Sequence, residues 1–99
     1  MKNIQSIDAT LIRMAELLRL GGRIDWANAL EKHHNEIASE PNATKGRILT
    51  LYGGMGSLND IVIYSNGSLL VKENNELNAL RSKLYELCHS PNLGDDTKE

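Results

Sequence analysis

Two adjacent histidines, His33 and His34, are the first residues whose type suggests chemistry, because imidazole is a common metal ligand. On a helix, neighbouring residues diverge by about 100°, whereas two ligands of one ion need a spacing such as i and i+4. His89 follows Cys88, but two neighbouring donors do not make a four-ligand site. The spacing therefore does not favour a metal centre, and we expect no cofactor.

The loop at residues 53–57, Gly-Gly-Met-Gly-Ser, is the most conspicuous glycine-rich run. Phosphate-binding loops lie between a strand and a following helix, and nucleotide-binding loops carry a lysine at a fixed position. Here we expect a helix before the loop and a strand after it, and no lysine occupies that position. The alternatives are a helix C-cap with a tight entry into the strand, or a surface that a partner backbone can approach closely.

Cys88 is the single cysteine, so no internal disulfide can form, and this usage is typical of a reducing cytoplasm. It lies beside the apolar stripe of an expected helix, where a small packing role is the default. The serines around the expected turn lack the context of a nucleophile elbow. These residues do not predict an enzyme.

Composition narrows the remaining classes of protein. A chain of 99 residues can close one modest core, and its net charge of −2 does not favour direct binding of nucleic acid. No run approaches the roughly 18 apolar residues that indicate a membrane span. The first eight residues lack the apolar stretch of a secretory signal. We therefore expect a cytoplasmic domain without a membrane segment.

The near-neutral total hides an uneven distribution of charge. Segment 25–40 has one basic against four acidic side chains, and segment 73–99 has three against six, so each carries −3. Segments 1–24 and 41–72 each carry +2. Two acidic segments on one face would suit a basic partner, and a solvated surface of mixed charge is the alternative.

The elements that must position these residues begin with two helices. Apolar residues at spacings of three and four over 4–18 predict the first helix. Asn3 or Ser6 would cap its start, and Gly21-Gly22 would end it. The same spacing predicts a second helix that begins at Asp25, a good N-cap residue, and includes a histidine on its apolar stripe.

The middle of the chain predicts a third, shorter helix. Pro41 ends the second helix, because the residue before a proline avoids helical backbone geometry. We expect a linker over 41–44 and a helix over 45–52, with Thr44 as its cap. The glycines at 53–54 would end this helix.

A β-hairpin and a last helix follow. Residues 60–64 predict a strand, because they are rich in β-branched and aromatic residues. Asn66-Gly67 is a strong signal for a two-residue hairpin turn, and 69–72 would be the returning strand. A leucine stripe then predicts a helix capped by Asn74 or Asn75.

Together these elements predict an α+β fold that is mainly helical. About four helices pack with a short β-hairpin whose strands lie near 60–64 and 69–72, because a hairpin alone is only marginally stable. Residues 1–92 would form one compact domain, and residues 93–99 a frayed polar tail.

The run from Leu51 to Ile63 contains Tyr-Gly-Gly-Met-Gly-Ser-Leu-Asn-Asp at residues 52–60. Together with Tyr85 and Cys88, this run resembles a family of small bacterial domains. Some proteins of this kind resemble immunity proteins of contact-dependent growth inhibition and related polymorphic toxin systems. The resemblance covers residues 7–88. It implies a cytoplasmic, non-enzymatic protein that binds and blocks one cognate toxin domain, often a nuclease.

The charge pattern is compatible with that implication. A nuclease active site must attract phosphate and is commonly basic, so acidic side chains can steer an inhibitor to it. Trp26, the only tryptophan, is either a core filler or an interface anchor, and the tyrosines divide similarly. The candidate toxin-binding residues are Asp25, Trp26, Glu31, Glu36, Glu40, Tyr52, Glu73 and Glu76.

We therefore expect an immunity protein that neutralises a cognate, basic nuclease toxin domain by blocking its active site. It would bind neither nucleic acid nor a membrane directly. The alternative is a non-enzymatic interaction or regulatory module unrelated to toxins, in one form a homodimer sealed through the hairpin edge. A small enzyme ranks third, since it would need a concave site with perturbed titratable groups.

Overall fold

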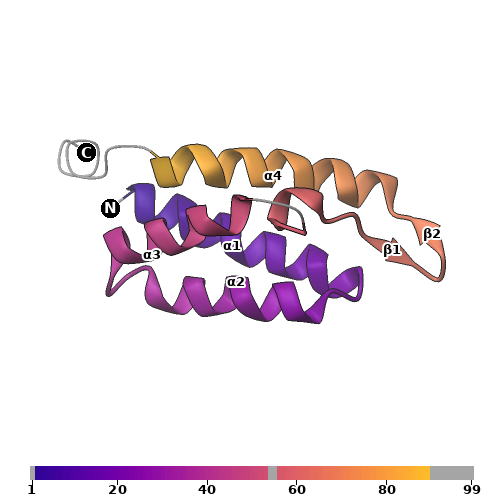
Figure 1. Ribbon diagram of the computed structural model, residues 1–99, viewed down its shortest axis with the longest axis horizontal. Coiled ribbons are helices and arrows are strands. Elements are labelled where there is room, and N and C mark those ends of the chain that lie inside the picture. The colour runs from indigo at the N-terminus through magenta and orange to yellow at the C-terminus, as the bar shows by residue number, and fades with distance from the viewer. Residues whose placement is uncertain (1, 54–55, 90–99) are drawn as a thin grey trace.

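The computed structural model describes residues 2–53 and 56–89 (Figure 1). Their order is α1 (Lys2–Leu20), α2 (Ile24–Glu36), α3 (Pro41–Leu49), the 3-10 turns η1 (Thr50–Tyr52) and η2 (Leu58–Asp60), β1 (Tyr64–Ser65), β2 (Ser68–Leu69) and α4 (Val71–His89). The predicted fold class is confirmed, because the described chain has four helices and one short antiparallel hairpin. The expected domain end at 92 and the tail 93–99 lie outside the described residues.

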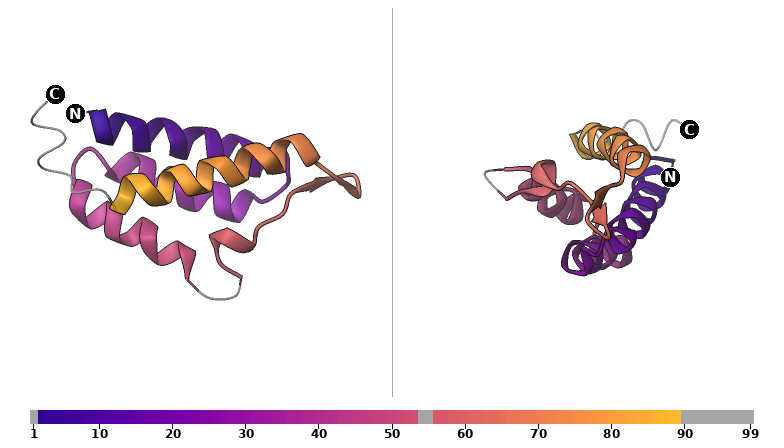
Figure 2. Two further views of the ribbon diagram at one scale, coloured as in Figure 1. Left: turned by 90° about the horizontal axis from the view of Figure 1, so that it is seen from above. Right: turned by 90° about the vertical axis from the view of Figure 1, so that its right-hand side faces the viewer.

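The helices form a ring around a shared core, which Figure 2 shows end-on. α1 packs extensively on α2 and also on α4, and α3 closes the ring by contacting both of these helices. α2 and α4 are therefore diagonal to each other. The hairpin projects from the end of the ring where α1 ends and α4 begins (Figure 1). Within residues 2–53 and 56–89, no helix is long and apolar enough to cross a bilayer.

The core confirms the apolar stripe predicted for the first helix. Ile7, Leu11, Met14 and Leu18 are all fully buried. The other elements fill the ring from the remaining sides with these buried residues: Leu30, Ile37, Ile48, Leu58, Ile63, Leu77, Leu84 and Cys88. Cys88 thus has the packing position expected from the sequence.

The glycine pair after α1 ends the helix as predicted. Gly22 adopts a φ of +78°, which costs glycine little. Its N–H donates to the carbonyl oxygen of Arg19 at 3.0 Å, and the N–H of Arg23 donates to that of Leu18 at 2.8 Å. These two bonds make a Schellman motif. The predicted caps at the other end are wrong, because Asn3 and Ser6 both lie inside the helix.

The starts of α2 and α3 also differ from the prediction. α2 begins at Ile24, with Asp25 in its first turn rather than at its N-cap. Residues 41–44 are helical rather than a linker, because Pro41 occupies the first turn, where its missing N–H and fixed φ are tolerated. Thr44 is consequently buried inside α3 and does not cap it.

The hairpin is confirmed, with shorter strands than predicted. Asn66 and Gly67 have φ values of 52° and 78°, as a type I′ turn requires. Tyr64 pairs with Leu69, and Ser65 with Ser68. Asp60 belongs to η2, and residues 71–72 belong to α4 rather than to a strand.

The predicted cap of α4 is wrong for a specific reason. Asn74 and Asn75 lie within the helix, and the side chain of Asn74 bonds to the extended segment before β1. Its Oδ1 accepts the N–H of Ile63 at 2.9 Å, and its Nδ2 donates to the carbonyl oxygens of Ile63 and Leu70 at 2.9 and 2.8 Å. The amide therefore satisfies Ile63 as a neighbouring strand would.

Candidate functional site

A groove of about 520 Å³ lies between α4 and the two 3-10 turns. Its lining comes from the end of α3, from η1 and η2, and from the second half of α4: Leu49, Tyr52, Gly53, Asn59, Arg81, Ser82, Tyr85 and Glu86. Tyr52, Gly53 and Asn59, from the run that carries the resemblance to small bacterial domains, thus line one wall, and α4 forms the other.

Tyr52, a predicted anchor, is held firmly in this groove. Its hydroxyl donates to the carbonyl oxygen of Arg81 at 2.8 Å, and burial raises the pKa of the phenol. Its ring meets that of Tyr85 edge to face, with centroids 5.1 Å apart. Tyr85 is 43% exposed, so it presents part of its ring to solvent.

Arg81 supplies a buried cation to the same groove, with only 9% of its surface exposed. Its Nη1 donates to the carbonyl oxygens of Leu58 and Ile61, each at 2.9 Å, and its Nη2 donates to Oδ1 of Asn78. Desolvation lowers the pKa of the guanidinium. Among the described residues, no carboxylate forms an ion pair with it, so its hydrogen-bond acceptors are all neutral oxygens.

Sequence reasoning did not select Arg81. The residue lies on the last predicted helix, where an arginine is usually solvated. The leucine spacing gave an indirect signal, because Arg81 follows Leu77 by four residues and therefore shares its buried face.

The hairpin presents a second candidate surface. The register pairs Tyr64 with Leu69, and the N–H of Leu70 bonds to the carbonyl oxygen of Ile63 at the base of the hairpin, where Val62 precedes Ile63 and Val71 begins α4. Side chains alternate between the faces of a strand, so Ile63 points into the core and its neighbours point away. The four outer residues, Val62, Tyr64, Leu69 and Val71, are 47% to 60% exposed.

We call these four residues the outer hairpin face. A half-buried hairpin normally carries polar residues on its solvent side. Here both sides are apolar, and Ile63 already packs under the turn between α1 and α2. A Cβ built on Gly21 would lie 2.6 Å from Cγ2 of Ile63, so only glycine leaves room for this contact.

The acidic residues that α2 and α4 contribute do not share one face. Glu31 and Glu36 lie on α2, whereas Glu73 and Glu76 lie on α4, diagonally across the ring. Figures 1 and 2 show these helices on different sides of α1. These four residues therefore do not form the single acidic face that was one of the two alternatives, whereas the contribution of each residue to binding stays a prediction.

Most of the predicted acidic residues are paired with arginines of the same chain. Hydrogen bonds to these arginines hold the pKa values of Asp25 and Glu76 below their usual range. The pairs are largely exposed, and such pairs add little stability. They are Arg23–Asp25, Arg19–Glu31, Arg47–Glu36, Arg47–Glu40 and Arg13–Glu76, whereas Glu73 has no ion pair among the described residues.

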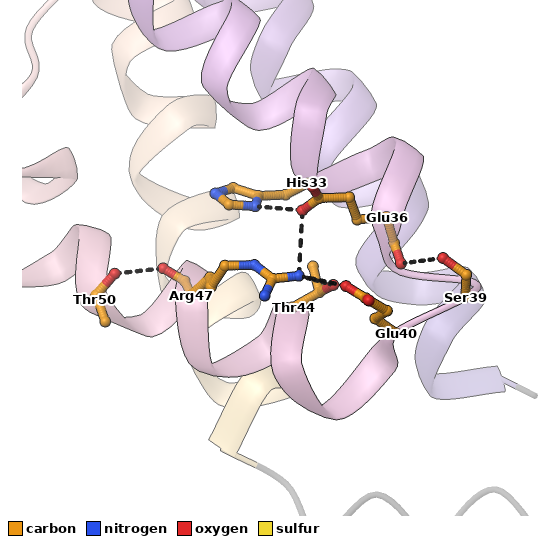
Figure 3. A network of polar contacts seen from close by, with 7 residues as sticks. All are labelled: His33, Glu36, Ser39, Glu40, Thr44, Arg47 and Thr50. Carbon is orange, nitrogen blue, oxygen red and sulfur yellow. Dashed lines mark hydrogen bonds and ion pairs between the residues drawn. The ribbon is translucent and has the colours of Figure 1, made fainter.

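A polar network joins α2 to α3 around Arg47 (Figure 3). Nη2 of Arg47 lies 3.4 Å from Oε1 of Glu36 and 3.0 Å from Oε1 of Glu40. Nδ1 of His33 lies 3.7 Å from the same Glu36 oxygen. Two predicted toxin contacts, Glu36 and Glu40, thus also brace the junction of two helices.

His33 is the buried histidine of α2, at 9% exposure. His34, which its place on the apolar stripe predicts to lie in the core or at its boundary, is partly exposed and contacts Asp8. Burial lowers the pKa of His33, and the nearby Glu36 carboxylate opposes that effect. In the part of the chain that the structure describes, no three His, Cys, Asp or Glu residues are arranged to hold a metal.

The remaining sequence candidates are the tryptophan, the cysteine and the glycine-rich loop. Trp26 is partly buried against the core, and its role as an interface anchor stays a prediction. Burial raises the pKa of the Cys88 thiol to about 11, so it is protonated at neutral pH and a weak nucleophile. Gly56, at a φ of +73°, donates its N–H to Oδ2 of Asp60 at 2.8 Å, whereas Gly54 and Met55 lie outside the described residues.

Residues 19–71 match a family described as a domain of unknown function, DUF6966. The match spans more than half of the chain, and the protein therefore belongs to this family. The matched segment includes the outer hairpin face and the 52–60 wall of the groove, whereas most of α4, including Arg81, lies beyond it. Neither a curated protein nor a solved structure matches the chain.

Proposed function

We propose that this protein is an immunity protein that binds a cognate toxin domain and blocks its active site. The observation that carries the proposal is the outer hairpin face, where four large apolar side chains are each about half exposed. Contiguous exposed apolar residues on a small domain mark a surface for another protein. The resemblance of the 52–60 run and its surroundings to immunity proteins supplies the class of partner.

The partner we propose is a nuclease domain whose active site is basic, because it must attract phosphate. Two predicted acidic contacts lie at the hairpin end of the ring. Asp25 is in the first turn of α2, and Glu73 follows Val71 in the first turn of α4. Figure 1 shows both helix starts at this end. Acidic groups around an apolar centre would steer a basic surface onto the hairpin.

The other predicted contacts take secondary places in this proposal. Trp26 follows Asp25 in sequence and is therefore also near the start of α2. Glu36 and Glu40 lie at the far end of α2 and beyond it, and Arg47 engages both. Glu31 and Glu76 bind arginines of α1, and Tyr52 lies in the groove. We therefore expect Glu73 to contribute most among the acidic residues, because it has no ion pair among the described residues, whereas Asp25 at the same end pairs with Arg23.

The test is co-expression of the full chain with the toxin domain encoded by the neighbouring gene. Wild-type protein should restore growth and co-purify with the toxin. The double variant Tyr64→Thr/Leu69→Thr keeps residues that favour strands but removes apolar area, and we expect at least about 30-fold weaker binding. Ile12→Ala, a truncation of another exposed apolar residue, is the matched control and should bind like the wild type.

Two outcomes would contradict the proposal. A toxin that stays fully active at saturating wild-type protein would exclude the inhibitory function. Unchanged affinity of the double variant, with an unaltered circular dichroism spectrum, would exclude the outer hairpin face as the binding surface.

One observation favours the alternative function, a homodimeric interaction module. Among residues 2–53 and 56–89, β1 and β2 pair only with each other, so within this part of the chain each strand keeps one free edge that a second copy could extend. Sedimentation of the chain alone separates the two functions. A monomer that forms a tight heterodimer with the toxin supports immunity. A dimer that the Tyr64→Thr/Leu69→Thr variant dissociates supports the alternative.

A further inference from the structure

Two arginines of this chain show how a guanidinium binds a carboxylate here. Arg13 donates from Nε and Nη2 to the two oxygens of Glu76, at 2.6 and 2.9 Å. Arg19 donates from the same pair of nitrogens to Glu31, at 3.1 and 2.6 Å. Both contacts are bidentate and use the edge formed by Nε and Nη2.

Arg81 leaves part of this edge unused. A guanidinium has five N–H donors. Nη1 can use both of its donors on the carbonyl oxygens of Leu58 and Ile61, and Nη2 uses one on Asn78. Within residues 2–53 and 56–89, Nε and the second donor of Nη2 have no acceptor. Nε of Arg81 therefore has a free donor on the edge with which Arg13 and Arg19 hold their carboxylates, and Nη2 has one further free donor.

The surroundings of Arg81 also favour an anionic partner. The residue is nine-tenths buried and lines the groove, so its charge lacks full solvation. Asp60 raises the pKa of Arg81 through space, but its carboxylate accepts the N–H of Gly56 and forms no ion pair with the arginine. Glu86 lines the groove five residues further along α4 and would limit the ligand to one that keeps its negative charge near Arg81.

We propose that the groove binds a carboxylate group of a peptide, held by the free Nε and Nη2 donors of Arg81 beside the rings of Tyr52 and Tyr85. The carboxylate is either a C-terminus or an acidic side chain, since the two share the same chemistry. The tyrosine rings supply apolar area and hydroxyl groups to the rest of the ligand. This site is independent of the proposed toxin-binding face, because the hairpin contributes no residue to the groove.

The test titrates the isotope-labelled full chain with three matched peptides and follows its NMR spectrum. The first is N-acetyl-glycyl-glycyl-leucine, which has a free C-terminal carboxylate. The second is its C-terminal amide, which lacks the charge. The third is N-acetyl-glycyl-aspartyl-leucine amide, whose only carboxylate is on a side chain. We expect a carboxylate peptide to shift the Nε–H signal of Arg81 and to bind at least about tenfold more tightly than the neutral amide.

A pair of variants at Ser82 keeps the fold intact, because this groove residue is exposed. Ser82→Asp places a carboxylate beside Arg81, where it repels or replaces the ligand, and should weaken binding of the charged peptide at least about tenfold. Ser82→Asn is the neutral variant of similar size, and the charged peptide should bind it at least about tenfold more tightly than it binds Ser82→Asp. Tyr85→Ala should lower the affinity of every peptide that binds by a similar factor, because it removes apolar contact rather than charge.

Each outcome of the peptide titration either supports or overturns the proposed carboxylate site. Preference for the first peptide identifies a C-terminus as the ligand, and preference for the third identifies an acidic side chain. Equal binding of the acid and amide forms overturns the proposal. The proposal is also overturned if no peptide binds at concentrations up to about 10 mM, or if the shifts are confined to residues outside the groove. Arg81 would then have only the structural role of connecting η2 to α4.

Discussion

The hairpin end and the groove are each held to α4 by a polar side chain of that helix, and the two side chains are two helical turns apart. Asn74 holds the segment before β1, and Arg81 holds η2 and the residue that follows it. A separation of seven residues places both side chains on the same face of a helix. Each anchors a segment without regular structure by bonding its backbone groups, so one helix face organises both surfaces.

The two anchors differ in charge and in saturation. Asn74 is neutral, and both its oxygen and its nitrogen have partners, so its role is structural. Arg81 is charged and has donors to spare. The surfaces differ accordingly, since the hairpin offers an apolar face and the groove offers a cation flanked by tyrosines. Asn74, whose polar atoms all have partners, thus supports a surface that would bind through the apolar side chains of the hairpin. Arg81, which keeps free donors, can itself act as a binding group.

The largest expected effect is at the base of the hairpin. Gly21→Ala places a methyl group against Ile63 and should lower the free energy of unfolding by about 3 kcal/mol, as overpacking does. Gly46→Ala is the control, because nothing lies within 4 Å of its new Cβ, and it should raise stability by up to about 1 kcal/mol. Urea denaturation measures both. Equal effects of the two variants would mean that the turn does not clamp the hairpin.

The next effect tests the neutral anchor itself. Asn74→Ala removes three hydrogen bonds and leaves the N–H of Ile63 unpaired, so stability should fall by about 2 kcal/mol. Hydrogen exchange at Ile63 should accelerate in this variant. Asn75→Ala, at the exposed neighbouring position, should stay within about 0.5 kcal/mol of the wild type. A neutral Asn74→Ala variant would remove the basis of the comparison between the two anchors.

A smaller effect is expected in the groove. Tyr52→Phe loses the bond from the hydroxyl to the carbonyl oxygen of Arg81 and should cost about 1 kcal/mol of unfolding free energy. Tyr85→Phe should be nearly neutral, because Tyr85 is more exposed. Parallel urea curves supply the measurement. A larger loss for Tyr85→Phe would show that the groove is held by the outer ring rather than by Tyr52.

The smallest effect separates both regions from the α2–α3 junction. Burial lowers the pKa of folded His33 below its ordinary value of 6.5, so the unfolded chain takes up a proton first as the pH falls. This contribution to stability is present above pH 6.5 and is lost as the pH falls through the folded pKa. Neither Asn74 nor Arg81 titrates in that range.

His33→Gln should therefore flatten the fall in stability below pH 6.5. His89→Gln, at an exposed position, is the control and should keep the wild-type slope. Urea midpoints at several pH values provide the measurement. Unchanged acid sensitivity in His33→Gln would place the titrating group elsewhere in the chain.

Local patterns predicted much of the fold. The apolar stripe of α1, the glycine end of that helix and the Asn-Gly turn all depend on neighbours within a few residues, and all three are confirmed. The capping predictions failed at Thr44 and Asn74 because a polar residue next to an apolar stripe can cap a helix or bond to another segment. A spacing pattern does not distinguish these roles.

The candidate site was predicted less completely. Tyr52 was selected and lies in the groove, but Arg81 was not, because its acceptors lie 20 and 23 residues away in an irregular segment. For the outer hairpin face, the sequence predicted that the residues lie in strands, but it did not predict which of them are exposed. Val62 and Ile63 are equally apolar, and only the packing of Gly21 decides which of them is covered.

The sequence by itself determined the helical periods, the turn chemistry and the family to which residues 19–71 belong, because these follow from residue type and short-range spacing. Only the tertiary structure decided which acidic residues are paired with arginines, which histidine is buried and which polar residues of α4 anchor the surfaces. Such choices depend on contacts between elements distant in the chain. A charged side chain such as Arg81 becomes a binding candidate only when the fold buries most of it beside a groove and leaves a donor without an acceptor among the described residues.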